Sequence, residues 1–159
     1  MRKVIRISML ALALSVVFGG TVFATVANTG FHSTILSRGT ISERVHADTH
    51  AVKLKTKGAV AVVTATATFK PLGSSGWHAH PGVVLVTVVS GSVVVYNEDC
   101  EATVQAAGSA FVESGGDAGL VRNESTTTPA VVNVTYIVPA GTPNTGLRID
   151  KANPGCPKS

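Results

Sequence analysis

The sequence predicts an all-β domain, built as a closed barrel or a double-sheet jelly roll. Short segments rich in Val, Ala and Thr recur with period-two alternation, and Gly- and Pro-containing turns separate them. Beyond the N-terminal segment, no long stretch spaces its apolar residues at i, i+3, i+4 and i+7, as an amphipathic helix would. Many short strands joined by tight turns are typical of barrels and jelly rolls.

The first 27 residues have the pattern of a secretory signal peptide and predict an N-terminal signal helix. Three basic residues precede an apolar run over 7–18, and small-residue cleavage sites lie between Ala24 and Ala27. The run is shorter than the ~20 residues of a spanning helix, which disfavours the alternative of a retained membrane anchor. We therefore expect Sec-type export to the cell envelope or beyond, with no stable membrane anchor after cleavage.

The charge of the chain is concentrated in this segment. It holds three of the 13 Lys and Arg residues and none of the nine Asp and Glu residues, so the remainder has a formal net charge of +1. The sequence pI of about 9.3 is thus mostly a property of the targeting signal. No later Lys/Arg cluster is interleaved with aromatic residues, and we expect no nucleic-acid partner.

The chain after the signal divides into three parts. Residues 28–50 are expected to form an N-terminal extension, with a short strand over 33–38 and a loop or short helix over 42–50. Residues 51–138 are expected to form the β-barrel, and residues 139–159 a tail that holds four of the seven prolines. About 130 residues suffice for one domain with its own core.

Each barrel strand is predicted from local alternation or from an apolar run. Val52, Leu54 and Thr56 alternate with three lysines, and residues 59–69 place Thr on one face against Ala and Phe on the other. Ser90-Gly91 lies between two Val-rich runs and predicts a hairpin. The remaining strands are expected at 83–89, 92–96, 101–105, 110–113, 118–123 and 130–138, with one further strand in the tail at 147–150.

Two cysteines, Cys100 and Cys156, predict a disulfide that fixes the tail. An exported chain meets an oxidising environment, and neither cysteine has a neighbouring His or a second Cys. The alternatives are two free thiols or a pair of metal ligands.

The stretch Gly76-Trp77-His78-Ala79-His80-Pro81-Gly82 is the strongest chemical signal. Residues at i and i+2 of an extended segment point to the same side, so His78 and His80 are expected to share one pocket. Neutral imidazole is a common metal ligand. By the same alternation Trp77 faces the other way and is expected to be a packing residue.

With these residues the sequence resembles the cupin superfamily, and particularly small exported actinobacterial cupin-domain proteins. The first cupin motif contains His-x-His, a Glu four or five positions later and a closing Gly; here His78 and His80 match, as does Gly91. The Glu position falls on Val84, or on Leu85 with the longer spacing. The resemblance implies a cupin-type double-stranded β-helix, a jelly-roll barrel.

The second cupin motif is matched less completely. Gly108, Gly116 and Asn123 have the expected spacing, but Ser114 replaces a Pro and Gly119 stands where the family has a His. The family implies three His and one Glu around a divalent metal, so two of these four ligands are missing from their usual positions. The metal site is therefore expected to be degenerate or weak.

A third ligand is hypothesised at Asp117. It lies two residues before Gly119, and in an unbroken strand it would face the same side. Two His and one carboxylate are the ligand set of non-haem iron oxygenases. The metal would be Fe, Mn, Zn or Ni, held by His78, His80 and Asp117, while Asn123 is expected to join the two histidines in lining the ligand pocket.

The leading functional hypothesis is an exported single-domain cupin that binds a small molecule in its barrel. One alternative is a metal-dependent oxygenase or isomerase that acts on a small polar or aromatic substrate, and another is a non-catalytic structural envelope protein. Cupin folds host many unrelated reactions, so the resemblance does not decide whether the chain is an enzyme. A homodimer is compatible with the family, whose sheets often pair edge to edge.

Overall fold

The computed structural model describes residues 28–157, which form an all-β structure with one 3-10 turn, η1 (Asn144–Gly146). The predicted signal helix lies outside the described residues. The strands are β1 (Thr29–Ile41), β2 (His46–Asp48), β3 (Lys53–Lys55), β4 (Val60–Ser74), β5 (His78–Ala79), β6 (Val83–Ser90), β7 (Ser92–Tyr96), β8 (Ala102–Ala106), β9 (Ala110–Glu113), β10 (Leu120–Arg122), β11 (Ala130–Pro139) and β12 (Ile149–Asp150). Within the described residues, none of the helical structure is of a length or apolarity that could span a membrane.

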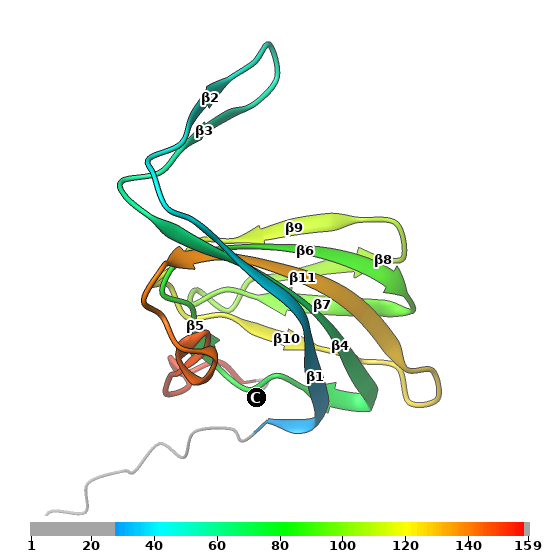
Figure 1. The fold of residues 1–159 in the computed structure, drawn as a ribbon. Coiled ribbons are helices and arrows are strands. Elements are labelled where there is room, and N and C mark those ends of the chain that lie inside the picture. Colours follow the sequence, from blue (N-terminus) through cyan, green and yellow to red (C-terminus); the bar gives the residue numbers. More distant parts are fainter. Residues whose placement is uncertain (1–27, 158–159) are drawn as a thin grey trace, which may run out of the picture.

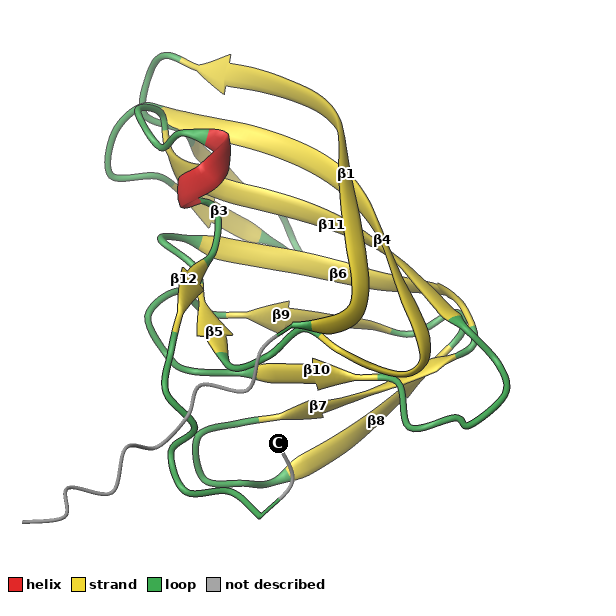
Figure 2. Cartoon of the chain, turned by 90° about the horizontal axis from the view of Figure 1, so that it is seen from below, coloured by secondary structure: helices red, strands yellow, loops and turns green. Residues whose placement is uncertain are grey.

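Eight strands form one curved sheet that folds over on itself (Figures 1 and 2). The strand order is β8-β7-β10-β4-β11-β6-β9, and β1 pairs with β4 outside this path. All pairings are antiparallel, and β4 is long enough to pair with β1 and β11 along most of its length and with β10 at its end. This arrangement is the nearly closed barrel that the alternating pattern predicts.

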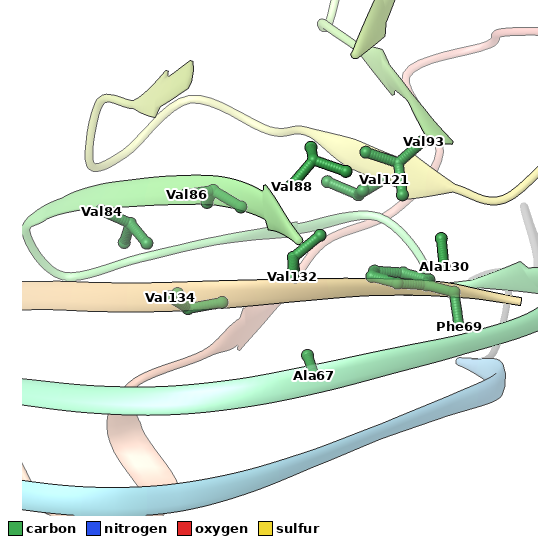
Figure 3. Packing of buried hydrophobic residues seen from close by; sticks show 10 residues of the cluster. All are labelled: Ala67, Phe69, Val84, Val86, Val88, Val93, Val121, Ala130, Val132 and Val134. Atoms are coloured by element: carbon green, nitrogen blue, oxygen red, sulfur yellow. The ribbon is translucent and has the colours of Figure 1, made fainter. Parts of the chain in front are cut away.

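The core lies between the two layers of this sheet. Alternate residues of β4, β6 and β11 point inward and meet Val93 of β7 and Val121 of β10. Figure 3 shows these side chains converging from both layers. The cluster consists of Ala67, Phe69, Val84, Val86, Val88, Val93, Val121, Ala130, Val132 and Val134. Its small, β-branched side chains fit closely spaced strands, which explains why so few aromatic residues suffice.

The N-terminal part differs from its prediction. Residues 29–41 form one long strand paired with β4 from end to end, so this part of the expected extension belongs to the main sheet. Residues 46–48 form β2, which pairs with β3, where a loop or short helix was expected. The β2–β3 hairpin stands away from the sheet (Figure 1). The sequence predicts only a part of β1, because nearly all side chains of this strand are exposed and its apolar residues do not alternate toward the core.

The tail is held against the barrel by pairing and by a disulfide. β12 pairs with β5, placing Ile149 opposite Ala79 and Asp150 opposite His78. The predicted bond between Cys100 and Cys156 is present, with the two Cα atoms 5.4 Å apart. Cys156 is buried in a cluster with Trp77, Tyr96 and Leu120. The tail is thus a fixed part of the wall beside the histidine segment.

We expect removal of the disulfide to destabilise the protein without changing its fold. The bond joins residues 56 positions apart, for which the chain-entropy estimate is about 4 kcal/mol. Paired substitutions, Cys100→Ser with Cys156→Ser, are predicted to lower the free energy of unfolding by about 2–4 kcal/mol in a urea titration. An unchanged urea midpoint would contradict this role. Wild type measured with and without reductant is the control.

Candidate metal centre

The two histidines lie side by side at one end of the barrel. β5 is flanked by β12 on one side and by an isolated bridge from His78 to Gly119 on the other, so neighbours on both sides hold its backbone. The imidazoles of His78 and His80 are 6% and 7% exposed, and their ring centroids lie 4.8 Å apart at an angle of 88°. Trp77, directly before His78, packs into the cluster around Cys156.

Each imidazole is oriented through its Nδ1 atom. Nδ1 of His78 lies 2.8 Å from the carbonyl oxygen of Gly76, and Nδ1 of His80 lies 2.6 Å from that of Leu147. A carbonyl oxygen can only accept a hydrogen bond, so each Nδ1 carries the proton and donates it. In a neutral imidazole the lone pair then resides on Nε2. Such backbone anchors are the usual second shell of metal-binding histidines.

The third member of the site is Glu113, the last residue of β9. Its Oε2 lies 3.3 Å from Nε2 of His80. Nε2 of His80 has no hydrogen-bond partner among the described residues that meets the geometric criteria, so the 3.3 Å contact is a close approach and not a well-aligned hydrogen bond. One ligand atom each of His78, His80 and Glu113 lies within 4.8 Å of the others.

The local electrostatics favour a neutral His78 and an ionised Glu113. Burial lowers the pKa of His78 from 6.5 to about 4; the nearby carboxylate of Glu113 opposes this shift, and the charges of Arg148 and His80 reinforce it. Burial by itself would raise the pKa of Glu113. The contact with His80, the two imidazoles in their protonated forms and the charge of Arg148 outweigh burial and hold this pKa below its usual value. At neutral pH the site therefore presents a neutral His78 and an ionised Glu113.

These residues fit a divalent metal ion. Among residues 28–157, two imidazoles and a carboxylate converge, and Nε2 of His80 is buried without a hydrogen-bond partner. Three such acceptors repel one another unless a proton or a cation lies among them. Two His and one carboxylate, with positions left open, are a known ligand set for first-row metals such as iron.

The structure brings His78 and His80 together but leaves Asp117 outside the group. Asp117 is exposed and accepts a hydrogen bond from Ser114, Oγ to Oδ2, at 3.2 Å. The hypothesis that Asp117 is a ligand assumes an unbroken strand through residues 117–119. In the structure β9 ends at Glu113 and β10 begins only at Leu120. The turn between them includes Gly116 at φ +105°, which breaks the alternation.

Asn123 also has a different position from the one expected. It is fully buried, and its Nδ2 lies within hydrogen-bonding distance of the carbonyl oxygens of Phe69, Lys70 and Thr128, while its Oδ1 accepts from the amide of Ser125. These contacts tie the loop over 124–129 to β4. Asn123 lines none of the cavities around the histidines.

Glu113 was not singled out as a ligand from the sequence, although the strand register explains its place. In the β6–β9 pair, Glu113 lies directly opposite Val84, the position where the cupin motif has its Glu. Side chains of directly opposed residues lie on the same face about 5 Å apart. The carboxylate therefore reaches the site from the neighbouring strand. The sequence feature that could have indicated Glu113 is its spacing: it lies two residues after Phe111 on a short strand, so both side chains face the same side of the sheet.

In the described part of the chain three cavities are lined by both histidines; the smallest holds about 40 Å³, and two are larger. One, of about 170 Å³, is lined by both histidines and by Glu113, Asp117 and Gly119 among others. The second, of about 220 Å³, is lined by both histidines, Tyr136 and tail residues. The ring of Tyr136 meets that of His80 edge-on with centroids 5.4 Å apart. Burial raises the pKa of Tyr136 to about 12, and the charge of Glu113 adds to the effect, so its hydroxyl keeps its proton.

Comparison with known families agrees with this architecture. Residues 65–143 match the family described as "Cupin domain". Over these residues the chain is similar to a cupin domain. The match contains β5, β6 and β9 and hence all three candidate ligands. It does not test the export or the actinobacterial character that the resemblance implied.

Solved structures with a similar fold share little sequence with the chain. A conserved protein of unknown function from Streptococcus pyogenes is 16% identical, with 70% of this chain and 76% of that chain covered and a TM-score of 0.49. A cupin domain from Bordetella pertussis is 19% identical, covering 70% and 97%, with a TM-score of 0.48. An oxalate oxidase bound to the substrate analogue glycolate is 24% identical, covering 46% and 40%, with a TM-score of 0.42. No curated protein matches the sequence significantly.

Substitution of Asn123 is expected to affect stability and to leave metal binding unchanged. Asn123→Ala removes the side chain that donates to the backbone carbonyls of Lys70 in β4 and Thr128 in the loop, and each unsatisfied buried group costs about 1–3 kcal/mol. We predict a loss of about 2–4 kcal/mol in urea unfolding, with wild-type metal content in the folded variant. Loss of metal from a variant that is still fully folded would instead place Asn123 in the site.

Proposed function

We propose that this cupin domain holds a divalent first-row metal ion through His78, His80 and Glu113, and binds a small molecule beside it. One observation carries the proposal. Three buried or half-buried acceptors converge within 4.8 Å, and each histidine has its Nδ1 proton committed to a backbone carbonyl. Such a group is stabilised by a cation at its centre.

The complete set of three ligands favours a metal-dependent enzyme over the degenerate site expected from the sequence. Catalytic metal sites commonly have three protein ligands and retain an open position for water or substrate. A metal ion held here would supply Lewis-acid or redox chemistry to a molecule in an adjoining cavity. Glu113 would balance part of its charge, and the carbonyls of Gly76 and Leu147 would keep both imidazoles in position. The alternative is a binding protein in which the metal only anchors the ligand.

A purely structural role has less support. The barrel interior is filled by the Val-rich core, yet cavities of about 170 and 220 Å³ remain where the histidines lie. A structural barrel needs neither these spaces nor a buried orphaned nitrogen, because buried polar groups without partners are costly.

We also propose that the protein acts outside the cytoplasm. The support is the signal-like pattern of the first 27 residues together with the buried disulfide, a bond that persists mainly in oxidising compartments. Peptide sequencing of the N-terminus of protein secreted from the native cell tests this directly. A mature N-terminus between residues 25 and 28 is expected, and an intact Met1 on the exported protein would contradict it.

The metal site is tested by elemental analysis of paired variants. We expect about one equivalent of a first-row metal per wild-type chain, a loss of at least tenfold in affinity in Glu113→Ala, and no loss in Asp117→Ala. The two substitutions remove the same carboxylate chemistry from neighbouring positions, so Asp117→Ala is the matched control. Wild type without metal, or equal content in all three proteins, would refute the proposed site.

A gain of ligand gives an independent test. Gly119 occupies the second-motif His position and bridges His78, so a side chain there projects to the same face as His78. A Cβ at Gly119 would meet only the Tyr96 carbonyl oxygen, at an ordinary 3.7 Å. We predict that Gly119→His folds normally and binds Zn²⁺ at least tenfold more tightly, as measured by competition with a chromophoric chelator. Unchanged affinity would show that this face does not meet the metal.

A further inference from the structure

The two larger cavities beside the histidines differ in charge. The cavity of about 170 Å³ is bordered by the carboxylates of Glu113 and Asp117, and no Lys or Arg lines it. Apart from the two histidines, the described residues that line the cavity of about 220 Å³ include one ionisable basic residue, Arg148 of the tail. An anion is therefore repelled on the first side and attracted on the second.

Arg148 is held so that part of its guanidinium is available to a ligand. Its Nε donates to Oδ1 of Asp150 at 2.7 Å, and Asp150 is fixed opposite His78 by the pairing of β12 with β5. Among residues 28–157 its two Nη atoms have no hydrogen-bond partner. The side chain is 28% exposed, whereas Asp150 is 77% exposed and its charge is largely screened by water.

The charge of Arg148 reaches the metal site. It contributes to lowering the pKa of both His78 and Glu113, which places the guanidinium within electrostatic range of both ligands. With a divalent ion present, the ion and Glu113 would together carry a net positive charge, and Arg148 would add to it. A ligand that spans from the metal to Arg148 is thus favoured if it is anionic.

The rest of the cavity wall is mostly apolar. Phe31 and Ile35 of β1, Ala65 of β4 and Tyr136 of β11 contribute carbon surface, and Ser33 and Asn144 add polar groups. The volume is below the 300 Å³ or more of pockets for drug-sized molecules. Such walls match a compact carbon skeleton and do not match a free inorganic anion.

We infer that the ligand of this site is a small organic carboxylate, whose carboxylate binds the Nη atoms of Arg148 and whose carbon body lies against Phe31, Ile35 and Tyr136. The inference rests on the proposed function, because the same histidines border the cavity and the metal. It assigns a specificity role to the tail segment, with Arg148 as the carboxylate-binding residue. Guanidinium and carboxylate form two parallel charge-assisted hydrogen bonds, which explains an Arg at this position.

The test is calorimetric titration of the full folded protein, loaded with Zn²⁺ and metal-free, with benzoate, butyrate, benzamide and inorganic phosphate. At least one carboxylate is expected to bind at least about tenfold more tightly than benzamide and phosphate. Arg148→Gln is expected to weaken that carboxylate at least about tenfold, with Arg148→Lys intermediate and Asp117→Asn equal to wild type or tighter. Thermal unfolding confirms that each variant is folded.

The outcomes separate this inference from the metal proposal. Binding of both carboxylates no tighter than that of benzamide, no carboxylate binding, or an unchanged carboxylate affinity in Arg148→Gln would overturn the carboxylate inference, whatever the metal content. Wild type that takes up no Zn²⁺ would overturn the metal proposal, and the metal-free titrations would then still decide the role of Arg148. Unaltered Zn²⁺ stoichiometry in Arg148→Gln is expected, because Arg148 is not a ligand.

Discussion

The arrangement of the site depends on two hydrogen bonds from imidazole to backbone. The protons on Nδ1 of His78 and His80 are directed to the carbonyls of Gly76 and Leu147, and Nε2 of His80 faces Glu113. If either carbonyl moved, the ring could rotate and the group of three would no longer converge. The turn before β5 and the tail before β12 are therefore as much part of the centre as the ligands themselves.

The general architecture could be predicted from the sequence because it follows from short-range patterns. Alternation in residues 59–69 and the apolar runs on either side of Ser90-Gly91 indicate strands, and the His-x-His spacing places both rings on one side. β1 was harder to predict, because its position depends on pairing with β4 and not on its own side chains. The roles expected for Asn123 and Asp117 differ from those in the structure. Asn123 supports a loop, and Asp117 lies in the turn before β10 and outside the group of three ligands.

Glu113 shows why a ligand set cannot always be read along one strand. The position of the family's Glu is occupied by Val84, fully buried in the core, and the carboxylate lies directly across the ladder on β9. Two neighbouring strands present side chains to nearly the same point in space, so a ligand can change strands with little change in geometry. Only the register of β6 with β9 relates the two positions, and register is a long-range property that composition does not reveal.

The placement of Leu147 has a consequence for the order in which the centre is assembled. All strands of the main sheet lie before residue 140, whereas the carbonyl that orients His80 and the guanidinium of Arg148 follow them in the chain. A nascent chain that has already completed its barrel possesses both imidazoles and Glu113, yet His80 still lacks its anchor. Completion of the centre therefore requires docking of the tail in addition to closure of the barrel.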